Sequence, residues 1–70
     1  MKYNGLSNEL KAREVSRQEA AEAIGTTIED FNMKLTGERD LTIDDAEVLI
    51  NVLKEKGSCI TYEDFNREGE

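Results

Sequence analysis

Residues 16–37 read SRQEAAEAIGTTIEDFNMKLTG and carry the pattern of two short helices joined by a tight turn. Ser16 and Glu19 stand three positions apart, as in a side-chain cap at the start of a helix, and Gly25 marks a stop. Two adjacent alanines, Ala20 and Ala21, lie between Glu19 and Gly25 and leave one side of this helix with only small side chains. A second helix can therefore lie close against it.

The second helix of this stretch follows after two threonines. Thr27 is suited to cap it, and Gly37 to end it. Between them, Ile28, Phe31 and Leu35 recur at spacings of three and four residues, which is the period of one helix face. The two helices together predict a helix-turn-helix, the arrangement that places its second helix in the major groove of DNA.

The order of capping, small and apolar residues in this region resembles that of a known family. The matching positions are Ser16, Glu19, Ala21, Ile24, Gly25, Thr27, Phe31, Lys34, Leu35, Gly37, Leu41 and Thr42. They are similar to the Cro/phage-repressor (XRE-type) helix-turn-helix family, and residues 1–10 and 60–65 resemble its first and last helices. The resemblance implies one lambda-repressor-like domain over residues 1–70, with its helix-turn-helix at 16–37. It also implies a DNA-binding regulator that is usually dimeric and often encoded by a phage or mobile element.

The rest of the chain also favours helices. Seventy residues allow one small core, and with no Pro or Trp, two Phe and two Tyr, aliphatic side chains and Ala must fill it. Apolar positions predict a first helix that ends near Glu14, although Gly5 weakens its start. A fourth helix is predicted from a cap at Thr42 to a stop at Gly57, and a short fifth one after Thr61. We therefore expect an all-α bundle of about five short helices.

The net charge of −7 runs against a nucleic-acid binder, because affinity for DNA comes largely from Lys and Arg that neutralise phosphates. Residues 1–25 carry four basic and four acidic side chains, whereas residues 26–70 carry five basic and twelve acidic ones. The acidic excess thus lies in the C-terminal two-thirds, part of which we expect to face away from any DNA.

Composition excludes several classes of function. The chain has no His, one Cys and no Gly-rich phosphate loop, so we expect no enzyme, metal site, cofactor or small-molecule substrate. Cys59 is either a partly buried small apolar residue or a redox or interchain thiol. The longest apolar run, residues 48–50, is far shorter than the roughly 20 residues that span a bilayer, and no signal-peptide pattern is present. We expect a cytoplasmic protein without membrane contact.

The predicted contacts to DNA phosphates follow from the family resemblance. They lie near the starts of the second and third helices and around the loop after the third, at Arg17, Gln18, Thr27, Lys34, Thr36 and Arg39. The family often has Gln at the position of Arg17, so Arg strengthens the electrostatics and alters any base-reading role. As an alternative, Lys34 and Arg39 are ordinary surface charges that pair with Glu38, Asp40 or Glu29.

The predicted contacts to DNA bases lie in the first two turns of the third helix, at Ile28, Glu29, Asn32 and Met33. Asn32 can pair with adenine and Glu29 can accept from the cytosine amino group. Ile28 or Met33 can touch a thymine methyl group. Two other interpretations stay open: Ile28 belongs to the core, or Ile28 and Met33 form an exposed surface for a partner helix.

Two functions therefore compete. The first is a sequence-specific transcriptional regulator that binds a double-stranded, pseudo-palindromic operator as a homodimer. The second is an acidic protein-interaction module, such as an anti-repressor or adaptor, on the same scaffold. Ile60, Tyr62 and Phe65 either supply the dimer surface or close the core of the monomer.

Overall fold

Four α-helices form most of the structure, which is a computed structural model describing residues 2–66. One short 3-10 helix follows them, and this part of the chain contains no strand. The elements are α1 (Asn4–Ala12), α2 (Arg17–Ala23), α3 (Ile28–Thr36), α4 (Ile43–Glu55) and η1 (Tyr62–Asn66). The all-α prediction is confirmed for these residues, while the two ends of the predicted 1–70 domain lie outside the described range.

The fifth helix differs from the prediction, because it is a single 3-10 segment rather than an α-helix. The Asp64 carboxylate accepts hydrogen bonds from the backbone N–H and the hydroxyl of Thr61, at 3.0 and 3.1 Å. The Asp64 backbone N–H in turn donates to the Thr61 carbonyl at 3.0 Å. A bond from residue i+3 back to residue i is the pattern of a 3-10 helix, so these contacts hold the chain in one tight turn.

One apolar cluster joins all five elements. Its largest fully buried side chains are Leu6, Leu10, Phe31, Leu35, Leu49, Leu53 and Phe65. Helix α2 contributes only Ala20 and Ala21, which are both completely buried where α2 packs against α3 and α4. Because these side chains are small, the backbone of α2 lies close to both neighbours, as the sequence predicted.

The predicted helix starts are confirmed. The side chains of Ser16, Thr27 and Thr42 each accept a hydrogen bond from the backbone N–H three residues later, at 3.0, 3.1 and 3.0 Å. At α4 the cap is reciprocal, since the Asp45 carboxylate also accepts from the Thr42 backbone N–H. Each cap satisfies an N–H group that has no partner within its helix.

All four α-helices end in the same way. In each, a residue with positive φ follows the last turn, and the next backbone N–H reaches back five residues to a helix carbonyl, at 2.8–2.9 Å. Glycine occupies the positive-φ position after α2, α3 and α4, whereas α1 uses Glu14, with φ at 60°. This is the Schellman ending, in which glycine is favoured because a side chain strains the left-handed conformation.

Gly5 has a packing role that the sequence analysis missed. It lies in the first turn of α1 at the contact with η1, and a Cβ atom placed on it would collide with the Asp64 carbonyl oxygen. We predicted that Gly5 weakens the start of the helix, and that stays a prediction. The structure adds that the absence of a side chain allows η1 to pack against α1.

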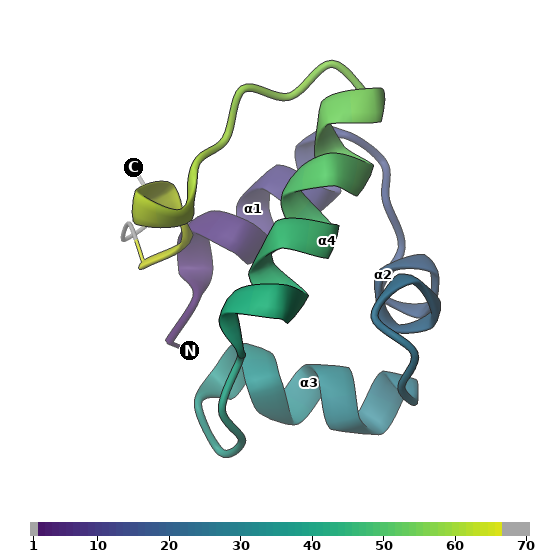
Figure 1. Ribbon diagram of the computed structural model, residues 1–70, viewed down its shortest axis with the longest axis vertical. Coiled ribbons are helices and arrows are strands. Elements are labelled where there is room, and N and C mark those ends of the chain that lie inside the picture. Colours follow the sequence, from purple (N-terminus) through teal and green to yellow (C-terminus); the bar gives the residue numbers. More distant parts are fainter. Residues whose placement is uncertain (1, 67–70) are drawn as a thin grey trace.

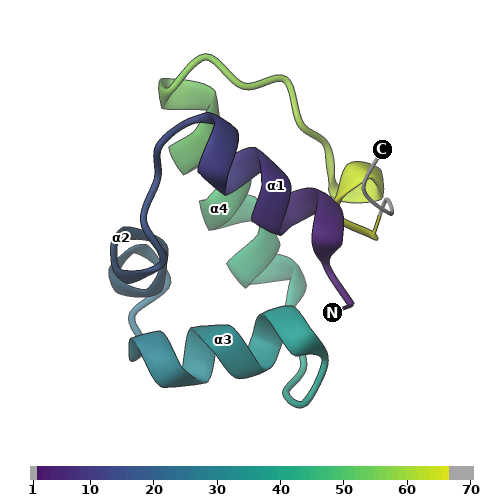
Figure 2. The same ribbon diagram turned by 180° about the vertical axis from the view of Figure 1, so that it is seen from behind.

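The arrangement of the helices leaves α3 at one edge of the molecule. Figures 1 and 2 view the chain from opposite sides, and in both α3 runs along the lower edge, with α2 beside its start and the other helices above it. The backbone N–H groups of Lys2 and Tyr3 donate to the Leu35 carbonyl at 3.2 and 3.1 Å, which joins the start of the chain to the end of α3. Among residues 2–66, no helix combines the length and apolar character needed to cross a membrane.

Candidate nucleic-acid interface

The outer face of α3 lies opposite its two buried side chains, Phe31 and Leu35. Phe31 and Leu35 are fully buried and fix the rotation of α3 about its axis. At about 3.6 residues per turn, the side opposite them carries Glu29, Met33 and Thr36. Glu29 and Thr36 are exposed and Met33 is half-buried. In Figures 1 and 2 the other helices all lie to one side of α3, so its other side is not covered by a helix.

Ile28 lies on the surface, so the interpretation that it belongs to the core is wrong. It shares the helical side of Phe31 and Leu35, as the spacing indicated, yet its side chain is 42% exposed. The reason is its position along the helix rather than around it. Ile28 is the first residue of α3, directly after the Thr27 cap, where the apolar cluster has already ended.

Asn32 occupies the flank of α3 that faces α2. Its Oδ1 atom accepts a hydrogen bond of 2.9 Å from Nη1 of Arg17, and Nη2 of Arg17 lies 3.5 Å from the hydroxyl of Ser7 on α1. Arg17 thus links three helices instead of extending into solvent. An amide oxygen has two lone pairs, so Asn32 can accept a second hydrogen bond from an adenine while Arg17 holds it.

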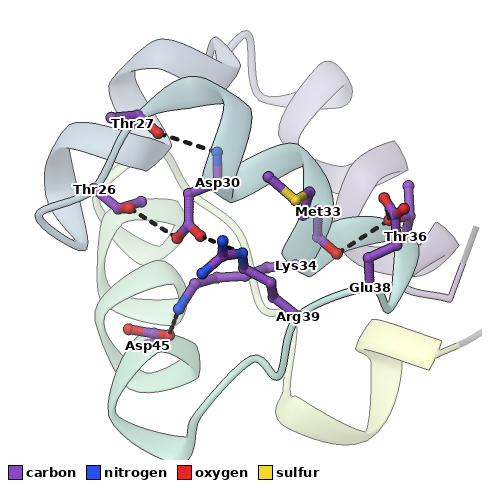
Figure 3. A network of polar contacts seen from close by, with 9 residues as sticks. All are labelled: Thr26, Thr27, Asp30, Met33, Lys34, Thr36, Glu38, Arg39 and Asp45. Carbon is purple, nitrogen blue, oxygen red and sulfur yellow. Dashed lines mark hydrogen bonds and ion pairs between the residues drawn. The ribbon is translucent and has the colours of Figure 1, made fainter.

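Lys34 occupies the opposite flank and points toward α4 (Figure 3). Its ammonium lies 2.6 Å from the Asp45 carboxylate, and the two side chains are only 15% and 16% exposed. Burial raises the pKa of the Asp45 carboxyl, but the hydrogen bonds from Lys34 and Thr42 outweigh it and leave the pKa lowered. Lys34 therefore has an acidic partner, but the partner is Asp45 rather than Glu38, Asp40 or Glu29, and the pair is largely buried rather than an ordinary surface pair.

Arg39, in the loop after α3, pairs with the first turn of that helix. Its Nε atom lies 3.1 Å from Oδ1 of Asp30, while Oδ2 of Asp30 accepts a 2.8 Å hydrogen bond from the Thr26 hydroxyl (Figure 3). The partner again differs from the acids that we predicted. No local spacing reveals it, because Asp30 and Arg39 are nine positions apart and meet only after the loop folds back.

The remaining predicted phosphate contacts are polar groups near the ends of α2 and α3. Gln18 is exposed and donates to Glu22 at 3.3 Å. The Thr27 oxygen is occupied as the cap acceptor, although its hydroxyl proton is still available to a phosphate. The Thr36 hydroxyl donates to the Met33 carbonyl at 3.0 Å. The predicted contacts thus lie on the outward face of α3 and beside its two flanks. Three basic side chains, Arg17, Lys34 and Arg39, each contact an acceptor within the protein.

The predicted dimer residues divide between core and surface. Ile60 and Phe65 are buried in the monomer core, so they close the core rather than offer a dimer surface. Tyr62 is 48% exposed and packs its ring against that of Phe65, with centroids 5.6 Å apart.

Cys59 is exposed, which contradicts the interpretation as a partly buried residue. It lies in the segment between α4 and η1, where its two neighbours, Ser58 and Ile60, are the buried side chains. Burial thus alternates along residues 58–60, and Cys59 is the one whose side chain faces solvent.

Comparison of the chain with protein-family models, with curated proteins and with solved structures finds no match.

Proposed function

We propose that this protein is a transcriptional regulator of the phage-repressor type that binds double-stranded DNA by laying α3 in the major groove. The observation that carries the proposal is the placement of α3. It is held by its buried side and both flanks, stands at the edge of the fold, and turns Glu29, Met33 and Thr36 outward. A helix that is firmly supported and open on one side has the shape that a major groove admits.

In this proposal the outward and first-turn residues meet the bases. Glu29 accepts from a cytosine amino group, Asn32 reads adenine, and Ile28 or Met33 touches a thymine methyl group. The phosphate contacts are made by Gln18, Thr27, Thr36 and Arg39, and by Arg17 through guanidinium N–H groups that Asn32 and Ser7 do not accept. Lys34 is assigned to the support of α3 instead, because Asp45 holds its ammonium in a largely buried pair.

A homodimer on a pseudo-palindromic operator belongs to the same proposal, since two copies related by a two-fold axis would read two half-sites. Of the three residues first considered for the dimer surface, only Tyr62 is exposed enough to take part.

An amide NMR titration of the labelled protein with a mixed-sequence duplex tests DNA binding, at about 50 mM and then about 200 mM salt. We expect shifts at Arg17, Gln18 and residues 27–39 that weaken at the higher salt, because phosphate contacts release counterions. The segment between α4 and η1, residues 57–61, runs along the side of the molecule away from α3 (Figures 1 and 2), so it serves as the internal control and should not shift. Absence of any shift at the lower salt would reject the proposal.

A second candidate function is an acidic protein-interaction module. It is favoured by the fact that Arg17, Lys34 and Arg39 all have acceptors within the protein, while exposed Glu29 lies beside exposed Ile28. On this view Ile28→Ala removes an exposed apolar contact and weakens capture of a basic partner, whereas Gln18→Ala has no effect. If DNA binding holds instead, both substitutions weaken binding to a duplex.

A further inference from the structure

The two ion pairs that flank α3 differ in how easily a phosphate can replace the carboxylate. Lys34 and Asp45 are 15% and 16% exposed, and Asp45 is also held by the Thr42 cap. Arg39, in contrast, is 60% exposed, although its partner Asp30 is only 19% exposed. A pair with one exposed member contributes little to stability, so its cation is free to exchange partners.

Asp30 is also held by contacts that do not involve Arg39. Its carboxylate accepts from the Thr26 hydroxyl at 2.8 Å, and its backbone N–H donates to the Thr27 side chain at 3.1 Å. Arg39, however, lies in the loop between α3 and α4 (Figure 3). When Arg39 turns to a phosphate, a fixed carboxylate is therefore left beside the DNA backbone, where like charges repel and a cation from solution must be taken up.

We propose, on the basis of the DNA-binding function above, that Asp30 is an intramolecular counter-ion that competes with DNA phosphate for Arg39. Asp30 thereby sets how tightly the protein holds any duplex and how strongly that affinity depends on salt. The contact is an autoinhibitory one built from the first turn of the recognition helix itself. It also gives a physical role to an acid that otherwise only disfavours DNA.

The test compares Asp30→Asn with Asp40→Asn, which removes the same charge from the exposed neighbour of Arg39. Asparagine can keep the hydrogen bond to Thr26, so we expect both variants to melt like the wild type. At about 50 mM salt, Asp30→Asn should bind a mixed-sequence duplex about fivefold more tightly than Asp40→Asn, the upper end for an exposed ion pair. The salt slope of Asp30→Asn should be steeper by about 0.9, so at about 200 mM its advantage falls to about 1.5-fold.

Arg39→Ala provides the second arm. In that background the advantage of Asp30→Asn over Asp40→Asn should shrink, because competition for the guanidinium is lost and only the repulsion between Asp30 and phosphate remains. Equal affinities of the two variants with Arg39 present would overturn the inference while leaving DNA binding intact. If no variant binds at about 50 mM salt, the proposed function fails and the inference fails with it. An advantage of Asp30→Asn that is undiminished in the Arg39→Ala background would overturn the inference in favour of simple repulsion.

Discussion

The hydroxyl of Ser58 donates a hydrogen bond of 2.5 Å to the carboxylate of Glu9, across 49 positions of the sequence. Ser58 is buried, and its oxygen also accepts from the Ile60 backbone N–H at 3.1 Å. One hydroxyl thus connects α1 to the segment that leads from α4 to η1. Neither residue stood out in the sequence.

Ser58→Ala should lower the free energy of unfolding by about 1–3 kcal/mol, because the buried Ile60 N–H loses its acceptor and Glu9 loses a donor. Urea unfolding at neutral pH measures the effect. The control is Cys59→Ala at the adjacent exposed position, which should change stability by less than about 0.5 kcal/mol. Equal effects of the two substitutions would contradict the contact.

Acid should destabilise the protein partly through Glu9. Hydrogen bonds from Ser58 and then Arg13 lower the pKa of its carboxyl below the usual 4.5, against the opposing effects of burial and of the Asp64 charge. Since the folded state binds protons less readily than the unfolded state, this stabilisation is complete above pH 4.5 and is lost as the pH falls through the lowered pKa.

The pKa of Asp45 is also lowered, so the stabilisation that its carboxylate gives the folded state is likewise lost as the pH falls. We therefore expect the free energy of unfolding to fall on acidification, and to fall less steeply in Glu9→Gln. Urea unfolding at a series of pH values measures both slopes, and identical slopes would show that Glu9 does not contribute.

Glu14→Gly should stabilise the fold by about 0.5–1 kcal/mol, because it removes a side chain from a left-handed residue. The other three helix ends already have glycine at this place. Glu14→Ala is the control, since it removes the charge and keeps the strain. Thermal melting of the two variants should therefore separate them, with Gly above Ala.

Ala21→Trp should destabilise the domain by about 1–3 kcal/mol or more, because α2 meets its neighbours through a completely buried small side chain. Ala23→Trp places the same side chain on the exposed end of α2 and should be tolerated. An unchanged melting temperature for Ala21→Trp would mean that the helix-turn-helix is wrongly placed.

The substitution Lys34→Met tests whether Lys34 stabilises the fold or contacts DNA. It leaves the largely buried Asp45 carboxylate without its ammonium, and we expect a loss of about 1–3 kcal/mol of stability. The salt slope of duplex binding should stay unchanged, whereas Arg17→Ala should reduce it by about 0.9. A smaller salt slope of duplex binding in Lys34→Met would show that Lys34 contacts a phosphate.

The features that the sequence predicted correctly are local ones. The caps at Ser16, Thr27 and Thr42 and the stops at Gly25 and Gly37 depend on residues within one helical turn, where side-chain chemistry decides the backbone. The buried side of α3, at Phe31 and Leu35, follows from the same short spacings.

The features that the sequence did not reveal depend on how the helices meet. Ile28 has the spacing of a core residue but lies beyond the end of the core. Lys34 and Arg39 find carboxylates eleven and nine residues away, on surfaces that exist only once the chain is folded. From the sequence, Gly5 is only a weak helix position, because its close contact with the backbone of η1 exists only in the folded chain.

The hydrogen bonds from Lys2 and Tyr3 to the Leu35 carbonyl have a practical consequence for anyone who purifies this protein. The side chain of Lys2 lies against Gly37, in the turn that leads to Arg39. An affinity tag fused ahead of Lys2 therefore starts beside the candidate interface, and a polyhistidine tag would bring cationic groups of its own to any duplex. Binding experiments are best made with the tag removed or attached at the other end of the chain.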